Sequence, residues 1–181
     1  MLLGEFGVTR EATMMIRLRV IPALLIINTV FASLGLSWGQ AVSVSSGPDG
    51  TAQITLGGGR ILTIPKERGQ VGISDAQIAS DGAVGWLADY SVDGVSYPIA
   101  GTLVVWRAGK PIRRFRTEQT FYSWAFYAQG KQVAYHTGPL HGEQKSRCEL
   151  RDVASGRKIA EWAGDLDSGT SRPIWTEGLN H

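Results

Sequence analysis

The chain has 181 residues, of which 43% are hydrophobic and 19% are charged, and its formal net charge is +2 at pH 7. These values exclude a large multidomain enzyme, a coiled coil, a collagen and a disordered charged tail. A nearly balanced charge gives no long-range field for nucleic acid, so no nucleic-acid partner is expected. The single cysteine, Cys148, rules out an intrachain disulfide framework and a multi-thiolate metal site.

The N-terminal region has the pattern of a secretory signal peptide. Val20–Leu36 is mostly apolar, Arg17 and Arg19 precede it, and the small residues Gly39 and Ala41 follow it. A basic segment, an apolar segment and small residues at the cleavage site, in that order, direct a chain for export. We therefore expect a secreted or periplasmic protein, with no stable membrane span after cleavage.

The start and the cleavage point of this leader are open to alternatives. Cleavage after Ala41 is preferred to cleavage after Gly39, which makes 1–41 the leader and 42–181 the exported domain. Translation starting at Met14 or Met15 would give the leader a more usual opening than residues 1–13 do. An uncleaved membrane anchor is the competing interpretation, although a span needs about 20 predominantly apolar residues.

After residue 42, short apolar runs alternate with glycine-containing turns, which is the pattern of strands. An all-β protein is therefore expected. Cys148 falls in one of the strands, so we expect it to be packed rather than reactive. The predicted strands are Thr51–Leu56, Arg60–Ile64, Gly72–Ala79, Ala83–Tyr90, Gly101–Trp106, Pro111–Arg116, Tyr122–Tyr127, Gln132–His136, Ser146–Val153 and Lys158–Trp162.

A repeat of 48 residues runs through this region. The segment Ile78–Gly82 has counterparts at Phe126–Gly130 and Ile174–Gly178, each 48 residues further on. Two strands joined by a tight turn, a loop of about ten residues and two more strands make up each unit. Four antiparallel strands in a unit of this length are typical of one blade of a β-propeller.

Two kinds of segment resemble WD-repeat blades. Val105–Ile112 and Leu150–Arg157 resemble the closing hairpin of such a blade, and Ala79–Gly82 and Ala128–Lys131 resemble the turn after its first strand. The tryptophan–aspartate pair of the repeat is split here, because Arg107 follows Trp106. The resemblance implies degenerate bacterial β-propeller repeats, about 2.5 blades in number.

The fold expected is thus all-β, with antiparallel four-stranded β-propeller-type blades in a partial propeller. The alternative is a β-barrel or sandwich meander. Either a truncated propeller or several chains associating into a ring would account for the small number of blades. The expected units are a half-blade at 51–64, blades at 72–116 and 120–162, and the start of a further repeat at 172–178, with a strand over 172–176.

Candidate chemistry is sparse. His136, His141 and Glu143 share one predicted loop and could supply three ligands to a metal ion, although a solvated loop between two strands is the simpler interpretation and the one preferred. No catalytic residue, metal site or cofactor is expected.

A basic run and several aromatic residues have structural interpretations too. Lys110, Arg113, Arg114 and Arg116 suit the outer strand of a sheet, which charge keeps soluble, or could meet an anionic glycan or a protein. The five tryptophans of the exported part are expected in packing between blades, namely Trp86, Trp106, Trp124, Trp162 and Trp175.

The function expected is that of an exported, non-catalytic repeat module that binds a protein or another ligand, or associates with itself through blade edges. Its partner would meet the loops Ser91–Ala100 and Thr137–Lys145, which follow the same strand in successive units. The alternative is a fragment of, or accessory domain to, a secreted hydrolase or metal-dependent enzyme.

Overall fold

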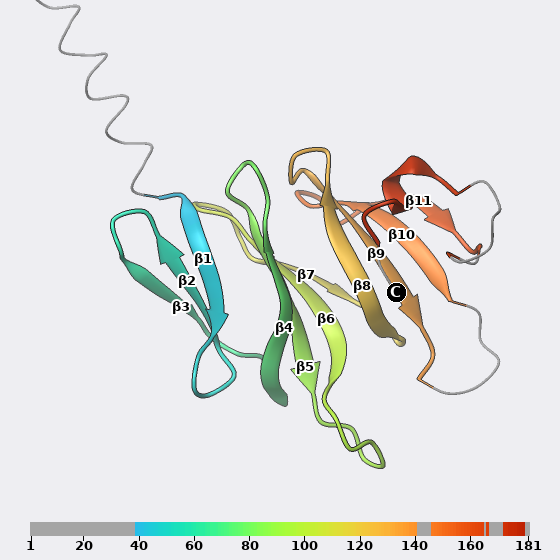
Figure 1. The fold of residues 1–181 in the computed structure, drawn as a ribbon, viewed down its shortest axis with the longest axis horizontal. Coiled ribbons are helices and arrows are strands. Elements are labelled where there is room, and N and C mark those ends of the chain that lie inside the picture. The colour runs from blue at the N-terminus through green and yellow to red at the C-terminus, as the bar shows by residue number, and fades with distance from the viewer. Residues whose placement is uncertain (1–38, 141–145, 165, 167–171, 180–181) are drawn as a thin grey trace, which may run out of the picture. The chain divides into compact units, whose positions relative to one another are not determined.

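The computed structural model describes residues 39–140, 146–164, 166 and 172–179, and these form three open antiparallel sheets (Figure 1). The first sheet has the order β1-β2-β3, the second β4-β5-β6-β7 and the third β11-β10-β9-β8. The all-β class and all ten predicted strands are confirmed. The elements are β1 (Ala41–Ser46), β2 (Ala52–Leu56), β3 (Ile61–Ile64), β4 (Gln70–Ile78), β5 (Val84–Tyr90), β6 (Ile99–Trp106), β7 (Arg113–Arg116), β8 (Thr120–Tyr127), β9 (Gln132–Gly138), β10 (Arg147–Asp152), β11 (Lys158–Trp162) and the 3₁₀ helix η1 (Ile174–Thr176).

Two expectations are corrected. The unit expected as a half-blade at 51–64 is a three-stranded sheet, because β1 pairs antiparallel with β2, from Ser46 opposite Ala52 to Ala41 opposite Leu56. The strand expected over 172–176 is wrong. Pro173 has no N–H to donate to a sheet, and its carbonyl instead accepts from the Thr176 N–H at 2.9 Å, which closes a 3₁₀ turn.

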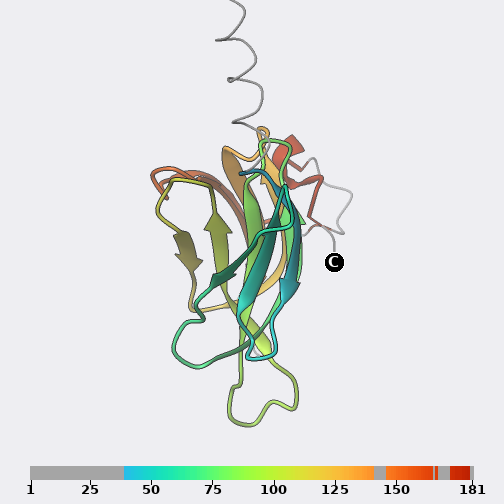
Figure 2. The same ribbon diagram turned by 90° about the vertical axis from the view of Figure 1, so that its left-hand side faces the viewer.

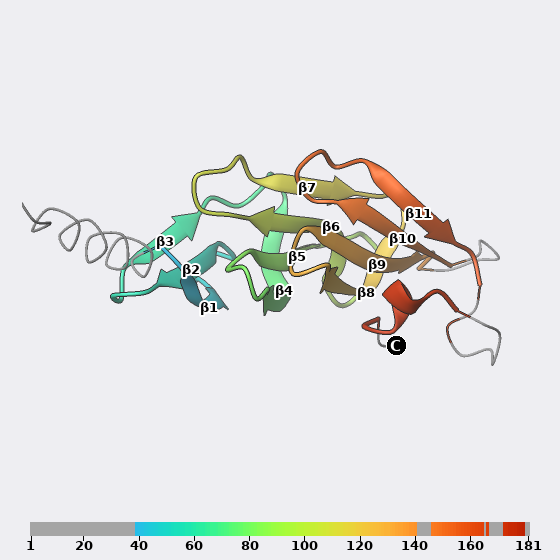
Figure 3. The same ribbon diagram turned by 90° about the horizontal axis from the view of Figure 1, so that it is seen from above.

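The sheets pack face to face, as the view from above shows (Figure 3). Three buried clusters hold them together. The first joins the first and second sheets around Ile54, Trp86 and Val104. The second joins the second and third sheets around Leu103, Trp124 and Tyr135. In the third, Leu166, Trp175 and Leu179 cover the outer face of the third sheet, over Ala134, Cys148 and Leu150.

Corresponding faces of the second and third sheets point in the same direction. Ile78 pairs with Val84 where β4 turns into β5, and Phe126 pairs with Val133 where β8 turns into β9. Val84 and Val133 therefore occupy equivalent positions in the two sheets. The stretch between the paired residues is one residue longer at the β8–β9 turn than at the β4–β5 turn. Val84 packs toward the first sheet and Val133 toward the second. The stacking is consequently head to tail, and each of these two sheets presents the same face to the sheet before it in the chain.

The connections segregate to two ends of the sheets, because successive strands are antiparallel. Tight turns, such as 79–83 and 107–110, lie at one end, which we call the turn end. The β5–β6 loop, residues 91–98, and the linkers 65–69 and 117–119 lie at the other, which we call the loop end. Figure 2 shows the β5–β6 loop projecting beyond the strands at the loop end.

The packing confirms the expected role of the cysteine and of three of the five tryptophans, while the other two pack on the outer face of the third sheet and not between sheets. Trp86, Trp106 and Trp124 are buried between sheets, and Trp162 and Trp175 pack against the third cluster. Cys148 is fully buried. Within the described part of the chain, no helix has the length and apolar character needed to span a membrane. Residues 1–38 of the expected leader, including Val20–Leu36, lie outside the described residues.

Candidate binding site

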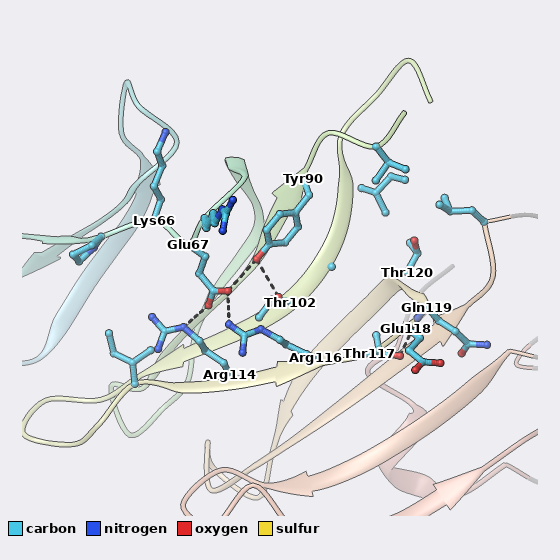
Figure 4. A pocket seen from close by; sticks show the side chains of 17 residues that line it. Lys66, Glu67, Tyr90, Thr102, Arg114, Arg116, Thr117, Glu118, Gln119 and Thr120 are labelled. Atoms are coloured by element: carbon cyan, nitrogen blue, oxygen red, sulfur yellow. Dashed lines mark hydrogen bonds and ion pairs between the residues drawn. The ribbon is translucent and has the colours of Figure 1, made fainter. Parts of the chain in front are cut away.

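A broad depression of about 1190 Å³ opens at the loop end, between the linker that enters the second sheet and the one that leaves it (Figure 4). Glu67 comes from the first linker, Tyr90 and Thr102 from neighbouring strands β5 and β6, and Arg116 from the end of β7. The β5–β6 and β9–β10 loops contribute Val92 and Leu140. The depression therefore draws on segments that are distant in sequence.

The Glu67 carboxylate is the centre of the polar network in this depression. Its Oε2 accepts from Arg116 at 2.6 Å and from the Tyr90 hydroxyl at 3.2 Å, and its Oε1 accepts from Arg114 Nε. The Tyr90 hydroxyl also lies 3.1 Å from Thr102 Oγ1. The side chains of Arg114 and Arg116, on the edge strand of the second sheet, are thus fixed in direction rather than free in solvent.

The linker that carries Glu67 is itself anchored. The Glu67 N–H donates to Gln70 Oε1 at 3.1 Å, and the Gln70 side chain, which is buried, donates to the Gly50 carbonyl at 2.7 Å. Lys66 Nζ donates to the Asp49 carbonyl at 3.0 Å. The turn between β1 and β2 therefore supports the linker, and through it the position of the carboxylate.

Tyr90 is held flat against the strand beside it. A Cβ at Gly101 would lie 2.9 Å from Tyr90 Cδ2, so only glycine leaves room for the ring there. Burial raises the pKa of Tyr90, partly offset by the hydrogen bond to Thr102, and the charge of Glu67 raises it further. The hydroxyl consequently stays neutral and remains a hydrogen-bond donor at the floor of the depression.

The charge state of Glu67 is set by its arginines. Burial by itself raises the pKa of this carboxyl, but the hydrogen bonds and charges of Arg116 and Arg114 outweigh burial and leave the pKa below its ordinary value. A general base works best when its pKa is near the working pH, so Glu67 is poorly suited to proton transfer at neutral pH. The network is built for holding side chains in position.

The basic run expected on an outer strand is divided between two places. β7 is the edge strand of the second sheet, as expected. Arg114 and Arg116 point into the depression at the loop end, whereas Arg113 bonds to the Val153 carbonyl of the third sheet at 3.1 Å. Alternation along a strand accounts for this division, because successive side chains point to opposite faces.

The three residues considered as metal ligands are only partly described. His136 lies buried in β9 beside the Tyr122 ring, at 5.3 Å between ring centroids, and not on a solvated loop. His141 and Glu143 fall outside the described residues. Among the residues that are described, no group of three or more His, Cys, Asp or Glu side chains is placed to hold a metal ion.

Glu67, Tyr90 and Thr102 were not expected as site residues. Pro65-Lys66-Glu67-Arg68 has the composition of a charged linker, and Tyr90 is the last residue of an ordinary strand. The repeat does not point to this network either, because the residue 48 positions after Glu67 is Phe115, which is buried between its two arginine neighbours on the other face of β7.

Comparison of the chain with protein-family models, with curated proteins and with solved structures finds no match.

Proposed function

We propose that this chain is an exported, non-catalytic module of β-propeller-like repeats that binds a protein partner at the loop end. The observation that carries the proposal is the arginine pair of β7, Arg114 and Arg116, which Glu67 fixes within an open depression. Because the side chains are already ordered, a partner would lose less conformational entropy in binding them.

The propeller-like part of the proposal is supported by the head-to-tail stacking of the sheets. In a propeller, each four-stranded blade packs one face on the blade before it and the other on the blade after it. The second and third sheets are four-stranded meanders that stack in this way. The segments that resemble WD-repeat blades, Val105–Ile112 and Leu150–Arg157, occupy the same hairpin in both sheets.

The chemistry of the loop end favours a partner with an acidic segment. The side chain of Arg116 is 65% exposed, and Lys66 and Arg68 line the same depression. Four basic groups there face two acidic ones, Glu67 and Glu118, so the excess charge is positive. Tyr97, at 59% exposure, stands on the adjoining β5–β6 loop. Arginine and tyrosine are among the residues that most often dominate the energetics of protein interfaces.

Export is supported by the leader, and the fold favours one of its two cleavage points. Ala41 is buried in the first cluster, and the Gln40 carbonyl accepts from the Gly57 N–H at 2.8 Å. Cleavage after Ala41 would remove both residues from the first sheet, whereas cleavage after Gly39 keeps them. We therefore infer that the exported chain begins at Gln40, which N-terminal sequencing of the secreted protein tests.

Affinity capture from the extracytoplasmic fraction of the native source tests the binding function. The immobilised wild type is compared with Arg116→Ala and with Arg60→Ala, which removes an exposed arginine at the turn end. We expect a protein that is enriched by the wild type and by Arg60→Ala and lost with Arg116→Ala. Enrichment of nothing, or equal enrichment by all three, would contradict the proposal.

A further inference from the structure

A second cavity lies at the turn end, between the second and third sheets, and has a volume of about 350 Å³. It is more enclosed than the depression at the loop end, and its size falls in the range of small-molecule sites. Turns of two sheets form its walls. Arg107, Lys110 and Arg113 come from the β6–β7 hairpin, Lys131 from the β8–β9 turn and Asp152 from the β10–β11 hairpin.

The positive charges of this cavity are not balanced by acidic groups. Arg107 pairs with the Asp81 carboxylate at 2.8 Å. The Asp152 carboxylate accepts from the backbone N–H and the hydroxyl of Ser155, at 2.7 and 2.6 Å, within its own turn. Among the described residues, Lys110, Lys131 and Arg113 form no ion pair. Four cations thus face two carboxylates, which leaves an excess of two positive charges.

The two arginines are held in place by backbone carbonyls. Arg113 spans the gap between the sheets, donating from Nε to the Val153 carbonyl at 3.1 Å and from a terminal nitrogen to the Ala154 carbonyl. Arg107 donates to the Gly130 carbonyl in the same way. Carbonyl bonds orient a guanidinium group without neutralising it, and only Arg107 has a carboxylate partner as well, Asp81. The charge of Arg113 therefore has a fixed position, and the exposed Lys110 and Lys131 line the same cavity.

The geometry points to a binding site for a small, doubly charged oxyanion, a phosphate group either free or carried as a monoester. Two uncompensated charges match a dianion, and the guanidinium and ammonium groups donate the charge-assisted hydrogen bonds that phosphate oxygens accept. The apolar walls, Val105 and Pro111, lower the local dielectric and strengthen these contacts. A phosphate bound there would contact turns of both sheets and so stabilise their packing.

Calorimetric titration with inorganic phosphate tests this site, at pH 7.5 and at an ionic strength held constant with sodium chloride. We expect saturable binding to the wild type and a rise in the midpoint of thermal unfolding, since a ligand that binds only the folded state stabilises it. In the double variant Lys110→Gln/Lys131→Gln the affinity is expected to fall at least about tenfold. Both lysines are exposed, so this variant retains the fold.

The matched control is Arg60→Gln/Arg172→Gln, which also removes two positive charges, from exposed arginines that line neither this cavity nor the depression at the loop end. It is expected to bind phosphate as the wild type does. Absence of saturable binding to the wild type, or equal weakening by the two double variants, would overturn the assignment. Titration with glycerol phosphate distinguishes a phosphate monoester from free phosphate as the ligand. An affinity comparable to that for inorganic phosphate indicates a monoester, and a lower affinity indicates the free ion.

Discussion

The indole N–H of Trp124 donates to the Asp75 carbonyl at 2.9 Å, from the first strand of the third sheet to that of the second. The Trp124 carbonyl in turn accepts from Gln77 Nε2 at 2.9 Å. The register of β4 against β5 is irregular between Ser74 and Gln77, and Asp75 has a φ of 44°. The bulge therefore turns a carbonyl of β4 out of its own sheet and toward the next one.

Replacing Trp124 by phenylalanine should destabilise the fold by about 1–3 kcal/mol. Phenylalanine keeps an aromatic ring but removes the N–H, so the partly buried carbonyl of Asp75 loses its donor. Urea unfolding followed by circular dichroism measures the change. Trp86→Phe is the matched control, because Trp86 is as buried as Trp124, each 2% exposed, and forms no indole hydrogen bond among the described residues. An equal loss in both variants would show that ring volume, and not the hydrogen bond, is responsible.

The same tryptophan makes Gly85 intolerant of a side chain. A Cβ at Gly85 would lie 2.4 Å from Trp124 Cη2, whereas a Cβ at Gly72, on the neighbouring strand, meets nothing closer than 3.9 Å. We expect Gly85→Ala to lose about 1–3 kcal/mol through overpacking and Gly72→Ala to be neutral or slightly stabilised. Thermal unfolding of the two variants decides this, and a tolerated Gly85→Ala would contradict the close contact between the sheets.

The fold should become less stable in acid because the Glu149 carboxylate becomes protonated. Glu149 is buried in β10, where it accepts hydrogen bonds from the Tyr135 hydroxyl at 2.7 Å and from Arg151 Nε at 2.8 Å. Burial alone raises the pKa of Glu149, but the hydrogen bonds of Tyr135 and Arg151 and the charge of Arg151 leave it below its ordinary value. The pKa of Glu149 is lower in the folded chain than in the unfolded chain, where it is about 4.3. The ionised carboxylate therefore adds to the free energy of unfolding above about pH 4.3, and this contribution is lost as the pH falls through the pKa of the folded chain.

Glu149→Gln should therefore be less stable than the wild type at pH 7, by about 1–3 kcal/mol, and its stability should decline less between about pH 5 and pH 3. Urea midpoints measured across this pH range test the slope. Glu177→Gln, which alters an exposed carboxyl that takes part in none of the ion pairs around Glu149, is the control and should keep the wild-type slope. A Glu149→Gln curve parallel to that of the wild type would refute the assignment.

The unique thiol reports on the segment that covers the third sheet. Cys148 lies under Leu179 and Trp175, and burial raises its pKa to about 11. We expect no reaction of the folded protein with a disulfide reagent on a timescale of minutes. Leu179→Ala removes part of the cover and should accelerate labelling at least about tenfold through local opening. Ile174→Ala, at an exposed position of the same segment, should leave the rate unchanged.

The sequence pattern is sufficient for the strands of the second and third sheets, but not for β1, for the C-terminal segment or for the packing. Alternation and glycine turns identified every strand of the second and third sheets, because turn chemistry is local. The pattern does not indicate β1, which follows the expected signal segment directly and has mostly exposed side chains. The likeness of Ile174–Gly178 to earlier segments predicts a strand, but Pro173 cannot donate to a sheet, and η1 forms there instead.

The candidate site was harder to predict because it depends on contacts between distant segments. Glu67 bonds to Arg114 and Arg116 at separations of 47 and 49, and Trp124 bonds to Gln77 and Asp75 at the same two separations. These separations are close to the period of 48, but none of them equals it. The period does not show that a carboxylate on a linker will meet the arginines of an edge strand, which requires the geometry of the turn that supports Glu67.

Photo-crosslinking from the loop end tests the central claim, that the chain acts by binding a partner there, most directly. Tyr97→Cys introduces a thiol on the β5–β6 loop for attachment of a benzophenone maleimide, while buried Cys148 stays unlabelled. Arg60→Cys places the same probe at the turn end. Irradiation in the extracytoplasmic fraction of the native source should give a discrete crosslinked protein from position 97 and none from position 60. No product from position 97, or the same product from both positions, would contradict the account.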